Sequence, residues 1–126
     1  MLIIEERSTR CRTIVGYSSI IFSLMKGVKM SLESEFQSKL IQRIKVMLPG
    51  CIVLKNDPNY INGIPDLIIL HGPRWAALEC KKEWDSPVRP NQMHYIFKMD
   101  KMSYAQFVFP ENLEEVLDGL QRSLTS

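Results

Sequence analysis

The chain has 126 residues, of which 45% are hydrophobic and 24% charged, and its formal net charge is +2. This size and composition fit one globular domain and exclude a disordered, collagen-like or membrane-spanning protein. The even charge balance does not by itself argue for nucleic acid as a partner. The three cysteines are an odd count without C-x-x-C spacing, which argues against a disulfide scaffold or a structural zinc site and favours reduced thiols in a cytoplasmic protein.

Residues 1–29 differ in charge from the rest of the chain. They hold five basic and two acidic residues, which leaves eleven basic and twelve acidic residues to the remainder. Their apolar run, residues 14–25, is too short for a bilayer, which needs about 20 residues, and no small-x-small site follows to support a signal peptide. The codons for residues 26–29 can spell a purine-rich ribosome-binding sequence before the Met30 codon. We therefore predict that 1–29 is a leader outside the fold, that Met30 is the true start, and that 30–126 is the domain.

The pattern along residues 30–126 predicts the order α-β-β-β-α-β-α. Ser31 is suited to cap a helix that Pro49-Gly50 ends, Pro90 suits the first turn of a second helix running to about Met102, and Pro110 starts a third. The four strands are expected at residues 51–55, 66–70, 75–82 and 104–109. A polar loop at 56–65 and a turn at 71–74 separate the first three strands.

The hairpin of the second and third strands carries the chemistry. If Leu70 pairs with Trp75, paired residue numbers sum to 145 and Asp66 falls opposite Glu79, with Cβ atoms about 4.5–5.5 Å apart. Lys81 shares the face of Glu79. Two half-buried carboxylates this close are costly unless a cation neutralises them, and oxygen ligands suit Mg²⁺. Lys81 beside such a cation would orient a water or stabilise charge developing on a phosphate.

The first helix adds a further acid. On a helical wheel, Glu33 lies within about 60° of the apolar stripe that includes Phe36 and Leu40, whereas Glu35 lies about 200° from Glu33. A carboxylate on a core-facing stripe needs a partner, and the hairpin provides one. We therefore expect Glu33, rather than Glu35, to contribute to the site.

Each acid also has a simpler structural explanation. Asp66 alone could cap a turn after Pro65, and Glu33 could be an ordinary first-turn acid favoured by the helix dipole. Glu79 and Lys81 could be an ion pair on an edge strand. Three acids on one buried surface, however, are not explained by these alternatives together, and the combination favours a functional site.

The segment Gly63-Ile64-Pro65-Asp66, thirteen residues before Glu79-Cys80-Lys81, resembles the motif of the PD-(D/E)XK nuclease superfamily. The helix LESEFQSKL at 32–40 resembles its leading helix, in which an acid precedes apolar positions. The segment Arg89-Pro90-Asn91-Gln92 resembles the Pro-x-Gln helix start of the VRR-Nuc branch, which is common in phage and prophage genes. The resemblance covers residues 31 to about 120.

This resemblance implies a restriction-endonuclease-like αβββαβ core of class α/β, with a mixed four-stranded sheet flanked by helices. It implies hydrolysis of a DNA phosphodiester that depends on Mg²⁺ or Mn²⁺. Asp66 and Glu79 would bind the metal, helped by the Cys80 main-chain carbonyl, and Lys81 would position the attacking water.

Two further roles are implied by position. Glu33 would hold the metal directly or through water, and Gln92 would buttress the site or touch a phosphate. Because the domain is not basic overall, DNA contacts must come from local clusters, and such contacts weaken steeply with salt. The candidates for these contacts are Lys55, Arg74, Lys82, Arg89 and Lys98.

The resemblance also implies a homodimer acting on four-way junctions or flaps, in the cytoplasm of a bacterial host cell or encoded by a phage. Two other functions stay open. The chain could be a non-catalytic DNA-binding module that kept the fold, or a nuclease subunit that needs a partner such as a phage helicase or packaging protein.

Overall fold

A computed structural model describes residues 6–7, 10–11 and 32–126 of the chain. Contacts divide the chain into two units, Met1–Ser31 and Leu32–Ser126. In the first unit, β1 (Glu6–Arg7) pairs antiparallel with β2 (Arg10–Cys11). The predicted leader and the predicted start at Met30 fall mostly outside the described residues and stay predictions. No helix in the described ranges is long and apolar enough to cross a bilayer.

The second unit contains a four-stranded mixed sheet in the order β3-β4-β5-β6. Strand β4 is antiparallel to both β3 and β5, and β6 runs parallel to β5. The predicted αβββαβ core is thus confirmed. The elements are α2 (Leu32–Met47), β3 (Ile52–Lys55), β4 (Leu67–His71), β5 (Arg74–Cys80), α3 (Pro90–Met102), β6 (Tyr104–Val108), the 3₁₀ turn η1 (Pro110–Asn112) and α4 (Leu113–Thr125).

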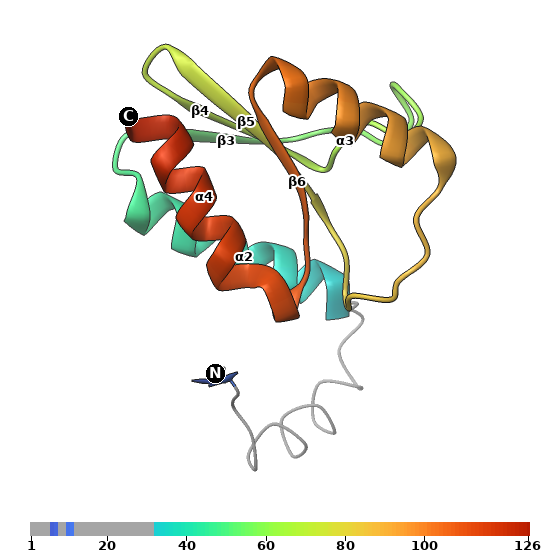
Figure 1. The fold of residues 1–126 in the computed structure, drawn as a ribbon, viewed down its shortest axis with the longest axis horizontal. Helices are drawn as coiled ribbons and strands as arrows, with labels where there is room; N and C mark the ends of the chain where they lie inside the picture. Colours follow the sequence, from blue (N-terminus) through green and yellow to red (C-terminus); the bar gives the residue numbers. More distant parts are fainter. Residues whose placement is uncertain (1–5, 8–9, 12–31) are drawn as a thin grey trace. The chain divides into compact units, whose positions relative to one another are not determined.

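The helices form one layer on each face of this sheet. Helices α2 and α4 pack on one face, and α3 packs on the other (Figure 1). The larger core includes Ile44 of α2, Leu78 of β5 and Leu120 of α4, all fully buried. The smaller core joins Ile96 of α3 to Ala77 of β5 and Ala105 of β6. Burial of these apolar side chains is the main stabilising contribution to the fold.

The β4–β5 hairpin has the predicted register. Leu70 pairs with Trp75 and Leu67 with Leu78, so paired numbers sum to 145. The turn is shorter than the expected 71–74, because His71 pairs with Arg74. Gly72 opens the remaining two-residue loop at a φ of +60°, which glycine adopts readily at this place in a tight hairpin.

Several element boundaries differ by one or two residues from the sequence expectation. Asp66 precedes β4, and the predicted strand through Lys82 ends two residues earlier, at Cys80. The neighbouring strand β6 ends at Val108. Among the residues that the structure describes, one main-chain bond continues the ladder beyond Cys80, from the Lys81 amide to the Val108 carbonyl (2.9 Å). The third predicted helix begins as the 3₁₀ turn η1 before α4. The charged residues of the hairpin therefore lie just beyond the paired strands.

Candidate active site

Asp66 and Glu79 meet at the end of the β4–β5 ladder. The Asp66 amide donates to Glu79 Oε1 (3.2 Å), and the Cys80 amide donates to Asp66 Oδ2 (2.8 Å). Glu79 and Ala77 are two residues apart in β5, so their side chains lie on the same face of the sheet. This is the face that packs against α3. The two carboxylates therefore converge on one side of the sheet, as the register predicted.

The Glu79 side chain is buried and that of Asp66 is half-buried. Burial, and secondly the charge of Asp66, raise the pKa of Glu79 to about 7, against the opposing effect of Lys81. Burial also raises the pKa of Asp66, while the hydrogen bond from the Cys80 amide and the charge of Lys81 lower it. Glu79 is only 4% exposed. A pair of carboxylates that repel each other in a poorly solvated place favours a bound cation, and their oxygen atoms are donors that Mg²⁺ and Mn²⁺ accept.

Lys81 extends beside this pair with a side chain that is largely buried. Its ammonium donates to the Pro87 carbonyl (3.0 Å) and to Gln92 Oε1 (3.0 Å). The Lys81 Nζ atom lies 3.8 Å from Glu79 Oε2, which makes an ion pair but is beyond hydrogen-bond length. Two of the three ammonium protons thus have fixed partners.

Gln92, in the first turn of α3, joins the two charged groups. Its Nε2 donates to Glu79 Oε2 (2.9 Å), while its Oε1 accepts from Lys81 and from the Arg89 amide (3.1 Å). Because Lys81 and a backbone N–H can only donate and a carboxylate accepts, these partners fix the orientation of the amide. Gln92 therefore connects Lys81 to Glu79, and its expected roles, as a buttress of the site or in touching a phosphate, stay predictions.

Glu33 reaches the same end of the sheet from α2. Burial, and next the charge of Asp66, raise the pKa of Glu33, while Lys81 and Lys82 lower it. Figure 1 shows the start of α2 beside the segment that follows β5. Within the described ranges, no group of three or more His, Cys, Asp or Glu side chains could hold a metal ion. The immediate cluster is therefore the Asp66–Glu79 pair, with Glu33 as an electrostatic neighbour.

Comparison with known proteins then identifies the architecture. No protein-family model matches the chain, and no curated protein matches its sequence. A solved structure described as a VRR_NUC domain matches with a TM-score of 0.58 and 21% sequence identity. The chain has the fold of a VRR_NUC domain. The match covers 70% of this chain and 96% of that chain, so nearly all of that domain has a counterpart here.

Within this VRR_NUC fold, the thiol of Cys80 is separate from the carboxylates. Its side chain is fully buried in the core shared with α2 and α4. Burial, and secondly the charge of Asp66, raise the pKa of the Cys80 thiol, so the thiolate is disfavoured. The Cys80 main chain, rather than its side chain, therefore adjoins the carboxylates, and the expected role of its carbonyl at the metal stays a prediction.

The basic residues proposed for DNA contacts do not form one cluster. Lys82 directly follows Lys81, and Arg89 precedes the first turn of α3. Lys55 ends β3 and Lys98 lies on α3, both exposed. Arg74 starts β5, five residues from Glu79, which is about 17 Å along the strand and thus distant from the carboxylates.

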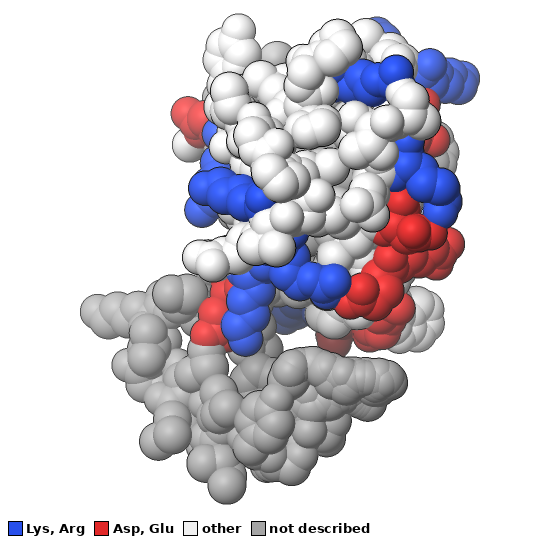
Figure 2. All heavy atoms as spheres, turned by 90° about the vertical axis from the view of Figure 1, so that its left-hand side faces the viewer, with Lys and Arg blue, Asp and Glu red and all other residues white. Residues whose placement is uncertain are grey.

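Figure 2 views the side of the molecule that lies to the left in Figure 1. Lys and Arg side chains form separate groups on this face, and Asp and Glu side chains gather near one edge. The described residues thus show no continuous basic band on this face. On this face, a DNA contact would therefore use separate groups of basic residues rather than a broad positive surface.

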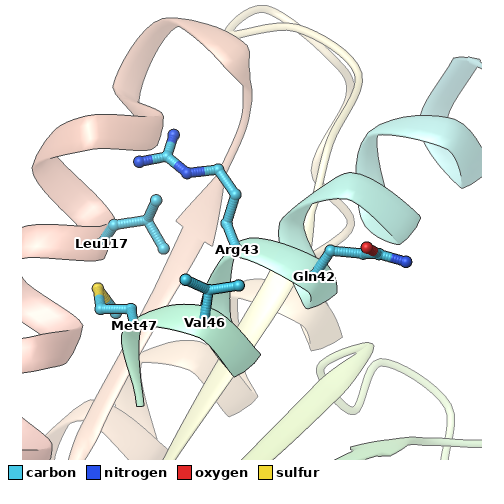
Figure 3. Close-up of a pocket in the computed structure, with 5 residues that line it drawn as sticks. All are labelled: Gln42, Arg43, Val46, Met47 and Leu117. Carbon is cyan, nitrogen blue, oxygen red and sulfur yellow. The ribbon is translucent and has the colours of Figure 1, made fainter. Parts of the chain in front are cut away.

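A shallow pocket of about 320 Å³ lies elsewhere, between α2 and α4 (Figure 3). Its lining is Gln42, Arg43, Val46, Met47 and Leu117. An ion pair between Arg43 and Glu114 (2.5 Å) connects the two helices beside it. The lining contains no residue of the carboxylate site, so this pocket is a separate feature of the helix layer.

Sequence reasoning missed the Pro87 carbonyl and the contact of Gly63 with Asn91. The Pro87 carbonyl has no signal in the sequence, because every residue carries a main-chain carbonyl and only the path of loop 83–89 brings this one to Lys81. Gly63 belongs to the Gly-Ile-Pro-Asp segment and Asn91 is next to Gln92, but their close approach depends on how the loop before Asp66 meets the first turn of α3.

Proposed function

We propose that this protein is a metal-dependent endonuclease that hydrolyses phosphodiester bonds in DNA. The observation that carries the proposal is the desolvated pair Asp66 and Glu79, with the Lys81 ammonium held 3.8 Å from Glu79 Oε2. The VRR_NUC fold supports the assignment, because the fold itself suggests a nuclease.

The donor set suits a hard divalent cation. Mg²⁺ is commonly held by one or two carboxylates together with water and substrate phosphates. Asp66 and Glu79 would hold the ion with the Cys80 carbonyl, and Glu33 would add a charge directly or through water. When bound, Mg²⁺ or Mn²⁺ supplies Lewis-acid activation of water and of the phosphate.

Lys81 has the placement of a group that acts on water or phosphate. Pro87 and Gln92 fix two of its ammonium protons, and the third has only Glu79 Oε2, at 3.8 Å, among the described residues. This proton is free to turn toward a water or a phosphate oxygen, and the positive charge stabilises the negative charge that develops during hydrolysis. Gln92 bridges the two groups, because its amide bonds to both Lys81 and Glu79.

The substrate we propose is branched DNA, a four-way junction or a flap. A homodimer would present two such sites to two strands. The near-neutral charge of residues 30–126 limits general attraction to duplex DNA, so we expect binding to depend on few phosphate contacts, with Lys82 and Arg89 among the candidates.

The direct test is incubation of the protein with end-labelled four-way junction, flap and duplex DNA at low salt. We expect cleavage with Mg²⁺, none with EDTA, and faster cleavage of the branched substrates. Binding without cleavage of any substrate would contradict the proposal and indicate a non-catalytic DNA-binding module. Cleavage only after addition of a phage helicase or packaging protein would indicate a partner-dependent subunit.

Glu33 and Glu35 provide a matched comparison within one helix turn. We expect Glu33→Ala to lower the cleavage rate about 10- to 100-fold, the usual effect of removing a supporting partner of a metal site. Glu35→Ala should keep the rate within about twofold, because Glu35 lies about 200° from Glu33 around the helix. Initial rates at one Mg²⁺ concentration measure both variants, and equal losses would show that Glu33 has no special part in the site.

A further inference from the structure

The loop before Asp66 makes an unusually close contact with the first turn of α3. Gly63 has a φ of +94°, and a Cβ atom built there would lie 2.8 Å from the main-chain carbon of Asn91 and 2.9 Å from its Cβ. Real Cβ atoms do not approach other atoms this closely. The absence of a side chain at Gly63 is therefore what permits the contact, and the positive φ adds a second reason for glycine.

A hydrogen bond reinforces the same contact. The Asn91 side-chain amide donates to the Asn62 carbonyl (3.2 Å). The end of this loop is also bonded to Asn56, the residue after β3. The Asn56 side chain donates to the Pro65 carbonyl (2.7 Å), and the Asn56 main-chain N–H donates to the Asp66 carbonyl (2.8 Å). Gly63 is only three residues before Asp66, so we expect a displacement of Gly63 to move the Asp66 carboxylate.

The residue after Asn91 holds the other half of the site. Gln92 contacts both Lys81 and Glu79. The β4–β5 ladder ends at the pair Leu67 and Leu78, so Asp66 stands one residue beyond the paired region. The first turn of α3 thus contacts the loop that leads into Asp66 through Asn91, and the groups that follow β5 through Gln92.

We propose that Asn91 and Gly63 are positioning residues that set the separation of Asp66 from Glu79 and Lys81. The catalytic meaning of this role rests on the proposed nuclease function. Active sites need their groups held within about 0.5 Å, and a displacement of about 1 Å can cost about a hundredfold in rate. A single helix turn that touches both halves of the site supplies this precision.

The test compares Asn91→Ala with Ser103→Ala. Ser103 also donates one side-chain hydrogen bond to a main-chain carbonyl, that of Trp75, but at the opposite end of α3. Two readouts are made without DNA: the side-chain amide NMR signals of Gln92 in the metal-free protein, and the affinity for Mn²⁺ by calorimetry. We expect Asn91→Ala to shift the Gln92 signals and to weaken Mn²⁺ binding about tenfold. Ser103→Ala should match the wild type in both readouts.

A second variant approaches the contact from the other side. Gly63→Ala keeps the Asn91 side chain but places a Cβ atom in the contact between the loop and the first turn of α3. We expect this variant to lose at least as much Mn²⁺ affinity as Asn91→Ala. Unchanged Gln92 signals, or Mn²⁺ affinity equal to that of Ser103→Ala, in a folded Asn91→Ala protein would overturn the proposal. A wild-type protein that binds Mn²⁺ but cuts no DNA would refute only the nuclease function, since the comparison of variants uses no DNA.

Discussion

Lys81→Ala is expected to retain the fold and Mn²⁺ binding while losing DNA cleavage about a hundred- to a thousandfold, the usual effect of removing one donor that stabilises developing charge. The ammonium lies beside Glu79 and is oriented by Pro87 and Gln92, so no other described basic side chain is held in this position. Removing it also leaves the Pro87 carbonyl without this donor, which costs about 1–3 kcal/mol, while Gln92 Oε1 still accepts from the Arg89 amide.

Single-turnover cleavage at saturating Mg²⁺ measures this effect, with circular dichroism as the test of folding. Lys45→Ala is the control, because Lys45 is an exposed residue in the last turn of α2. It should cut at the wild-type rate. A Lys81→Ala protein that is folded and cuts as fast as the Lys45→Ala protein would remove Lys81 from the mechanism.

Asp66→Ala is expected to abolish metal binding and cleavage together. The substitution removes a carboxylate from a pair that we propose to hold the ion, and the partner of the Cys80 amide is lost with it. One carboxylate fewer should weaken Mn²⁺ binding by at least about a hundredfold, so that excess metal does not restore cleavage. Calorimetric titration with Mn²⁺ and cleavage over a range of Mn²⁺ concentrations give both quantities.

The stability of this variant distinguishes loss of the site from loss of the fold. Removal of Asp66 relieves its repulsion of Glu79, which opposes the cost of leaving the Cys80 amide unpaired, so we expect a Tm within a few degrees of the wild type. Asp118→Ala, which removes an exposed carboxylate paired with Arg122 on α4, is the matched control. Wild-type cleavage by Asp66→Ala would show that the assignment of Asp66 is wrong.

Much of the fold could be predicted because its signals are local. Pro90 set the start of α3, and a tight turn at Gly72 set the hairpin register that brings Asp66 opposite Glu79. The strand ends were less predictable. Whether β5 continues through Lys82 depends on where β6 stops, and the β-favouring residues of β5 themselves contain no information about that neighbour.

The sequence predicted which charged residues lie near one another in the candidate site. It did not predict the hydrogen bonds that hold them. The alternation of β5 put Glu79 and Lys81 on one face, and the helical wheel put Glu33 on the side of α2 where the charges of Asp66 and Lys81 act on it. The contacts of Gln92 and of the Pro87 carbonyl arise from the path of a loop, which no periodic pattern describes.

The central claim is that Asp66 and Glu79 together bind a divalent cation. Anomalous diffraction from crystals grown with Mn²⁺ tests it most directly, since the ion is located without reference to activity. We expect one strong peak in contact with carboxylate oxygens of both residues. A map with no peak there, or with Mn²⁺ bound only elsewhere on the protein, would contradict the claim.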